Sequence, residues 1–228
     1  MEKKVIQSAF RASLPVMAGY IVLGMGFGVL LSDKGYSFLW SVLMSTTIYA
    51  GSMQYAAIDL ISGGASLITT ALMTLMINAR HFFYGLSMLD RYQGAGKKKP
   101  YLIFALTDET YSLVVSPAPE GCDEKQYYFW VSLLDQIYWV LGSLIGGLLG
   151  PLLPFDSTGM DFAMTALFVV IFVEQWKSAK SHIPALLGLG IPLVCLMLLG
   201  AANFVIPSMI LITLALSLLR NYLEVKMQ

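Results

Sequence analysis

The chain has 228 residues, of which 57% are hydrophobic and 12% are charged. Its mean hydropathy is +0.71, which implies more apolar surface than a soluble domain of this length can bury. The composition therefore predicts an integral membrane protein. Lys and Arg together number 14, as do Asp and Glu. This balance argues against a nucleic-acid partner and against a polybasic membrane-surface role.

Seven apolar stretches have about the length of a transmembrane helix: 12–31, 38–61, 67–89, 127–149, 162–173, 183–199 and 204–219. A shorter one, 101–115, carries Thr107-Asp108-Glu109-Thr110 at its centre. Backbone polar groups in lipid must be satisfied within their own segment, and the dyad alternation of a membrane barrel is absent. We therefore expect an all-α integral membrane protein with seven to eight hydrophobic segments in one domain over 1–228.

The N-terminus resembles a signal peptide, because residues 1–11 are weakly basic and lead into an apolar run. No convincing small-residue cleavage site follows, so we expect this first segment to be retained. The two cysteines lie in different settings, Cys122 in a polar loop and Cys195 in an apolar stretch. They predict neither a disulfide framework nor a metal site, and no cofactor is expected.

Several stretches contain helix-breaking residues. Pro15, Gly19 and the glycine run 24–28 interrupt the first, and 49–54 interrupts the second. Pro151 and Pro154 end the stretch 127–149. The glycine run is not expected to be a phosphate loop, since no strand precedes it.

Basic residues cluster at four places, 3–11, 91–99, 177–180 and 220–226. If all four are cytoplasmic, an even number of crossings separates each cluster from the next. The broken stretch 38–61 and the short stretch 101–115 would then each enter and leave on one side. The alternative is eight full spans with 91–99 outside. We favour the re-entrant arrangement.

The middle of the stretch 67–89 carries Asn78, Arg80 and His81. A guanidinium at bilayer depth costs roughly 2.5 to 3.5 kcal/mol, so such a residue usually faces the protein interior and marks a transport path. We expect Arg80 to bind a substrate carboxylate or an acidic residue, with Asn78 and Tyr84 as further binding candidates. His81 titrates near neutral pH and is a candidate proton acceptor. The alternative is a structural ion pair beside a hydrogen-bonded histidine.

Asp108 and Glu109 form the only adjacent acidic pair within an apolar stretch. In a transporter they would carry protons, hold a substrate ammonium or neutralise Arg80, while Thr107 and Thr110 would cap a broken helix. The alternative is that the stretch is interfacial and both acids are simply hydrated.

The run 49–54 places Tyr49, Gly51, Ser52 and Gln54 in the middle of a segment. Unwound backbone at such a break can bind the charged ends of an amino acid. Equally, the small residues would allow close helix packing, with Tyr49 and Gln54 hydrogen-bonded across helices.

Three glycines at four-residue spacing, Gly142, Gly146 and Gly150, predict a helix-packing face. Asp135 and Gln136 lie near the start of the same stretch. They line the same cavity as the groups above or occupy an interfacial position, and the sequence leaves both interpretations open.

Three runs resemble the AzlC family, the large subunits of bacterial branched-chain amino acid exporters. They are Ile48-Tyr49-Ala50-Gly51-Ser52-Met53-Gln54, Arg80-His81-Phe82-Phe83-Tyr84-Gly85-Leu86-Ser87 and Leu106-Thr107-Asp108-Glu109-Thr110-Tyr111. The resemblance implies export of leucine, isoleucine, valine, methionine and azaleucine across the bacterial cytoplasmic (inner) membrane. It also implies a small membrane subunit of the AzlD type as partner, and leaves oligomerisation open.

The leading hypothesis is a secondary exporter driven by ion exchange, since no ATP-binding motif is present. The alternative is a channel or a non-transporting assembly subunit. A membrane hydrolase using His81 is disfavoured, because the sequence lacks Gly-x-Ser-x-Gly and His-Glu-x-x-His signatures. We therefore do not expect an enzyme.

Overall fold

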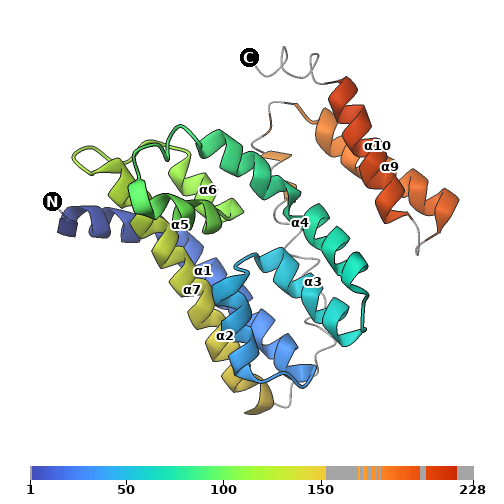
Figure 1. Ribbon diagram of the computed structural model, residues 1–228, viewed down its shortest axis with the longest axis horizontal. Helices are drawn as coiled ribbons and strands as arrows, with labels where there is room; N and C mark the ends of the chain where they lie inside the picture. The colour runs from blue at the N-terminus through green and yellow to red at the C-terminus, as the bar shows by residue number, and fades with distance from the viewer. Residues whose placement is uncertain are drawn as a thin grey trace. The chain divides into compact units, whose positions relative to one another are not determined.

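The computed structural model describes residues 2–152, 181–200 and 204–219, together with 169, 172–173, 176–177 and 179. The chain forms two compact units, Met1–Met164 and Thr165–Gln228. Regular structure in the described residues is entirely helical, as predicted (Figure 1). Most of the predicted stretch 162–173 lies outside the described residues, as does Pro154.

Three long helices and four short ones build the described part of unit 1. The long helices are α1 (Glu2–Asp33), α4 (Leu67–Met88) and α7 (Glu124–Leu149). The short ones are α2 (Phe38–Thr47), α3 (Gly51–Ser62), α5 (Lys99–Phe104) and α6 (Asp108–Val114), and two short 3₁₀ turns occupy Gly96–Lys98 and Gly150–Leu152. In unit 2, α9 (Ile183–Leu199) packs on α10 (Val205–Leu218).

Glycines let α1 and α7 pack parallel to each other at backbone distance. A Cβ added at Gly28 would overlap the Ser143 carbonyl and the Gly147 nitrogen, and one at Gly146 would overlap the Met25 carbonyl. The predicted packing face on α7 is therefore confirmed. No side chain larger than hydrogen fits at these contacts.

The predicted interruption of the first segment is wrong. Helix α1 continues through Pro15 and through the glycine run 24–28 without a break. A glycine in a helix indicates either a break or a close contact with another segment. Here the glycines are in close contact with the backbone of α7, and the helix is not broken. The other breaks occur where predicted, between α2 and α3 and after α7.

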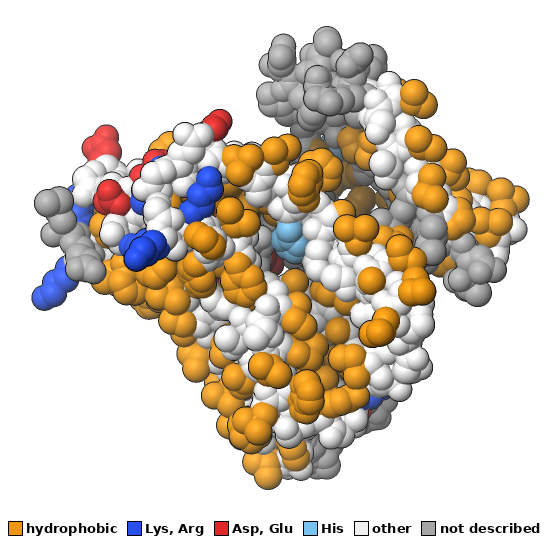
Figure 2. Space-filling model, in the orientation of Figure 1, with side chains coloured by type: hydrophobic (Ala, Val, Ile, Leu, Met, Phe, Trp, Pro, Cys, Tyr) orange, Lys and Arg blue, Asp and Glu red, His pale blue; other side chains and the backbone are white. Residues whose placement is uncertain are grey.

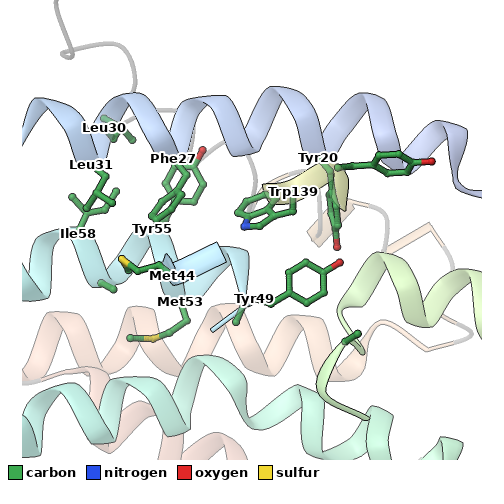
Figure 3. Packing of buried hydrophobic residues seen from close by; sticks show 14 residues of the cluster. Tyr20, Phe27, Leu30, Leu31, Met44, Tyr49, Met53, Tyr55, Ile58 and Trp139 are labelled. Carbon is green, nitrogen blue, oxygen red and sulfur yellow. The ribbon is translucent and has the colours of Figure 1, made fainter. Parts of the chain in front are cut away.

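Helices α2 and α3 form a hairpin that returns to the end from which it starts. Phe38 lies against Gly147 at the start of α2, and Gln136 Nε2 donates to the Thr46 carbonyl (3.2 Å) at its end. Helix α3 then runs back until Ile58 packs beside Leu31 in the core cluster (Figure 3). The stretch 38–61 therefore starts and finishes at the same end of unit 1.

Helices α5 and α6 form a second hairpin from the opposite end. Lys98 Nζ donates to Gln126 Oε1 (2.6 Å) near the start of α7, and Tyr101 Oη donates to Gln136 Oε1 (2.7 Å) farther along it. The chain then turns, and Val114 at the end of α6 packs in a cluster with Val131. The stretch 101–115 thus also turns back toward the end of unit 1 from which it starts.

Charged residues gather at the end of unit 1 where the second hairpin starts (Figure 2). Lys4 Nζ donates to the Glu120 carbonyl (3.0 Å). Arg91 donates to Tyr128 Oη (3.1 Å), a contact that raises the pKa of the guanidinium and keeps it charged. The first two basic clusters therefore lie at one end of unit 1, which is the placement that the re-entrant arrangement predicts. Which stretches are re-entrant in a membrane remains a prediction.

Two helices in the described part of the chain are long and apolar enough to cross a membrane, over Lys3–Asp33 and Glu124–Leu152. Helix α4 has 22 residues, but Asn78, Arg80 and His81 lower its hydropathy. The number of seven to eight membrane segments remains a prediction.

Candidate functional site

The breaks of the two hairpins meet in the interior of unit 1. Tyr49, in the first break, has a φ of 46°, a left-handed conformation that is uncommon for a residue other than glycine. Its ring lies 6.2 Å from that of Phe104, and both Tyr49 and Ala105 belong to the core cluster that includes Tyr20. Figure 3 shows Tyr20 and Tyr49 pointing into the same region beside Trp139. Two helix ends from opposite directions therefore share one buried space.

Arg80 of α4 connects the two breaks. Its Nη1 lies 2.8 Å from Asp108 Oδ2 at the start of α6, and its Nη2 donates to Ser52 Oγ (2.8 Å) at the start of α3. The Arg80 and Asp108 side chains are 25% and 19% exposed. Arg80 Nε and Asp108 Oδ1 are buried and have no partner among the described residues. The pair thus has unused hydrogen-bonding capacity.

Glu109 faces a different set of groups from its neighbour Asp108. Tyr20 Oη of α1 lies 2.7 Å from Glu109 Oε2 and 2.6 Å from Thr107 Oγ1. Thr107 also accepts from the Thr110 amide (3.3 Å), which confirms the predicted threonine cap of α6. The acidic pair is therefore held in the interior of the bundle rather than at its surface.

Asp135 of α7 is completely buried, which decides the question that the sequence left open. Its Oδ2 accepts from Thr110 Oγ1 (2.8 Å), and its Oδ1 has no partner among the described residues. Gln136, the next residue, instead anchors both hairpins through Thr46 and Tyr101. An acidic residue inside an apolar stretch is the sequence signal that marked Asp135, although it was not selected as a site residue.

Gln54 belongs to a neutral network that holds α2, α3 and α7 together. Its Nε2 donates to Ser45 Oγ (3.0 Å), and its Oε1 accepts from Trp139 Nε1 (2.9 Å). Ser45 in turn donates to Ser143 Oγ (2.7 Å). Gly51 lies against the Trp139 ring, where a Cβ would approach within 3.0 Å. The geometry favours the packing interpretation for these two residues over a direct role in binding.

Asn78 and His81 line a cavity of about 170 Å³ beside the first break. Its other lining residues are Ile48, Tyr49, Ala50, Ile103, Phe104 and Leu106. The Asn78 Oδ1 and Tyr49 Oη atoms are buried without a partner in the described part of the chain. It is a small space lined mainly by apolar residues, with polar groups of Asn78 and His81 at its wall.

Tyr84 lies one turn beyond Arg80, and its ring stacks on Tyr111 of α6 with 4.5 Å between centroids. The ring of His81 lies 6.0 Å from that of Tyr84. The structure thus gathers Arg80, Ser52 and Asp108 in one group and Tyr49, Asn78 and His81 around the cavity. Sequence reasoning missed Tyr20, whose position in an ordinary apolar helix carries no distinguishing signal.

Comparison with known proteins gives one family. The family model described as AzlC protein matches residues 15–153. The chain is similar to the branched-chain amino acid transport protein AzlC of Bacillus subtilis, with 44% identity over 96% of this chain and 86% of that protein. It is 45% identical to an uncharacterized membrane protein of Helicobacter pylori over 97% of both chains. It is 29% identical to the inner membrane protein YgaZ of Escherichia coli over 74% of this chain and 72% of that protein. No solved structure matches significantly.

Proposed function

The chain belongs to the AzlC family, and we propose that it is a proton-coupled secondary transporter that exports branched-chain amino acids. Its substrates would be leucine, isoleucine and valine, with methionine and azaleucine as further ones. A transport role fits the family, since a relative of 44% identity is a branched-chain amino acid transport protein.

The observation that carries the proposal is the ion pair of Arg80 at the meeting point of the two breaks. A guanidinium binds a carboxylate through two parallel hydrogen bonds, and Asp108 occupies only part of the donors of Arg80. A substrate carboxylate can therefore replace Asp108 on Arg80. This exchange of partners needs no further charge in the bundle.

The same exchange of partners supplies the coupling. Once displaced, Asp108 would be a buried carboxylate without a cation, which is costly unless it takes up a proton. Binding of one substrate carboxylate would thus accompany uptake of one proton. Glu109 and His81 lie close to Asp108 in the fold and are the further groups that we assign to the proton path.

The cavity beside Tyr49 is suited to the apolar side chain of the substrate. Its lining is largely aliphatic and aromatic, and its size favours a small branched chain over a bulky aromatic one. Asn78 and Tyr49 have free polar atoms there for hydrogen bonds to the amino acid backbone. Arg80, Ser52 and Asn78 would then hold the charged end of the substrate.

We place the chain in the bacterial cytoplasmic membrane as a multi-pass protein, with its basic clusters on the cytoplasmic side. This follows the preference of Lys and Arg for cytoplasmic loops, and Lys4 and Arg91 lie at one end of unit 1. A small membrane subunit of the AzlD type is proposed as partner from the family resemblance. Lipid would cover the exposed apolar side chains of the long helices.

The test is labelled leucine flux in proteoliposomes, with and without the small partner subunit. A carrier gives saturable flux and leucine–leucine counterflow. With one proton coupled to each leucine, it also gives about tenfold accumulation per unit of imposed pH gradient, since one pH unit corresponds to about 1.36 kcal/mol. Conductance without saturation would indicate a channel. Absence of both in every combination would indicate an assembly subunit.

A further inference from the structure

A chain of short contacts joins Glu109 to Asp135 through three hydroxyl groups. It runs from Glu109 Oε2 to Tyr20 Oη (2.7 Å), to Thr107 Oγ1 (2.6 Å), to Thr110 Oγ1 (3.1 Å) and to Asp135 Oδ2 (2.8 Å). All four distances lie within hydrogen-bonding range. Tyr20, Thr107, Thr110 and Asp135 are all buried, with exposures of 5%, 7%, 0% and 0%. The two carboxyl groups are therefore connected within the protein without water.

The number of hydrogen atoms available for these four contacts indicates how many protons the two carboxyl groups hold. Thr107 donates to Thr110 and Thr110 donates to Asp135, so both threonine hydrogens are in use. Tyr20 has one hydrogen for two contacts, one with Glu109 and one with Thr107. If both carboxyl groups are ionised, one of the four contacts has no hydrogen. One added proton completes the chain.

The surrounding charges also favour one bound proton. The titratable and charged groups that face the chain are Tyr20 of α1, Tyr49 of the first break, Arg80 of α4, Tyr101 of α5, Asp108 of α6 and Tyr127 of α7. Arg80 is the only cation among these groups, and Asp108 is paired with it. Two further carboxylates, one partly buried and one fully buried, would be strongly unfavourable without a cation of their own.

We infer that Glu109 and Asp135 share one proton through Tyr20, Thr107 and Thr110, and that Asp135 is a second proton-holding position of the carrier. This inference rests on the proposed proton-coupled transport. When the proton leaves Glu109, it goes to Tyr20 Oη, the hydrogen of Tyr20 goes to Thr107, that of Thr107 to Thr110, and that of Thr110 to Asp135 Oδ2. Each hydroxyl gains one hydrogen and loses one. The net result is a Glu109 carboxylate and an Asp135 carboxylic acid.

Two substitutions interrupt this series of contacts with little change in shape, and a third is the rescue. Asp135→Asn can still accept from Thr110 but cannot take up the proton. Thr110→Val removes the hydroxyl and leaves both carboxyl groups in place. Thr110→Ser restores the hydroxyl and serves as the rescue. Thr74→Val is the matched control, because the Thr74 hydroxyl donates only to the Thr70 carbonyl of its own helix (2.7 Å).

The experiment measures two rates in the same proteoliposomes. We expect Asp135→Asn and Thr110→Val to lower the initial rate of pH-gradient-driven leucine flux by about 100-fold, the low end for positioned proton-transfer groups. Leucine–leucine exchange should stay within about twofold of wild type, and Thr110→Ser and Thr74→Val should keep both rates. If Thr110→Val keeps its gradient-driven rate, the relay is wrong. If wild type itself shows no leucine exchange, the proposed function is wrong.

A spectroscopic measurement tests the shared proton without any substrate. Infrared spectra of the protein in liposomes near neutral pH should contain a band of a protonated carboxyl group. Because one proton is shared, the band should change in both the Asp135→Asn and the Glu109→Gln variant. A band that is absent in wild type, or that responds to only one of the two substitutions, would overturn the inference even if leucine transport is confirmed.

Discussion

Both hairpins of unit 1 consist of two short helices joined at a break, but the break is neutral in one hairpin and charged in the other. The first, α2–α3, breaks at Tyr49 and is held by the neutral network of Gln54, Ser45 and Trp139. The second, α5–α6, breaks before Asp108 and Glu109, and at this break its polar contacts involve charged groups and the hydroxyls that connect them.

The Gln54 network and the carboxyl groups differ in whether their buried polar atoms all have hydrogen-bond partners. Both polar ends of the Gln54 amide have partners, whereas Asp108 and Asp135 each keep one buried oxygen without a partner among the described residues. A satisfied network fixes helices in place, and an incomplete one can accept a ligand or a proton. The Gln54 network of the first hairpin thus provides support, and Asp108 of α6 and Asp135 of α7 provide the incomplete carboxyl groups, while Arg80 joins the two hairpins through Ser52 and Asp108.

The largest effect is expected at Arg80, the residue common to both hairpins. Arg80→Ala and Arg80→Lys should each lower leucine flux by about 100-fold or more, since each charge-assisted hydrogen bond contributes about 1.5 to 3 kcal/mol. A lysine cannot reproduce the two contacts with Asp108 and Ser52. Membrane insertion, measured by immunoblot of washed membranes, should be unchanged. Full flux in Arg80→Lys would reduce the residue to a generic positive charge.

The second prediction separates coupling from binding in the charged hairpin. Asp108→Asn should keep a hydrogen bond to Arg80 and lose the ability to take up a proton. Accumulation under a one-unit pH gradient should therefore fall from about tenfold to about onefold. Leucine–leucine exchange in the same vesicles should persist. Wild-type accumulation by Asp108→Asn would make this carboxyl group structural.

The neutral hairpin should respond through stability instead of transport. Gln54→Leu leaves Ser45 Oγ and Trp139 Nε1 without the amide, and a buried unsatisfied group costs about 1 to 3 kcal/mol. We expect a lower unfolding temperature in detergent and an unchanged KM for leucine. A raised KM with normal stability would return Gln54 to the substrate site that the sequence suggested.

The smallest effect on transport is expected for substitutions at the two opposite ends of unit 1, where the hairpins begin. Lys98 lies where the charged hairpin begins, and Lys34 is exposed at the end of α1 where the neutral one begins. In a Cys122→Ser, Cys195→Ser background, Lys34→Cys should react with an impermeant maleimide in intact cells and Lys98→Cys should not. Neither substitution should alter flux. The reverse labelling would invert the proposed orientation.

Much of this arrangement could be predicted from local sequence. The break at 49–54, the cap and acidic pair at Thr107–Glu109 and the packing glycines of α7 each depend on a few neighbouring residues. The cost of a charge in an apolar stretch likewise marked Arg80 before any partner was known.

Only the tertiary structure decided which partner each of these residues has. Asp108 and Glu109 are adjacent, yet one pairs with Arg80 of α4 and the other meets Tyr20 of α1. Neighbouring helical side chains diverge by about 100°, so the helices packed on each side determine their chemistry. The glycine run of α1 supports the helix instead of breaking it for the same reason, because the α7 backbone lies against it. The local sequence determines which interactions each residue is able to make, and contacts between distant segments determine which of these interactions it makes.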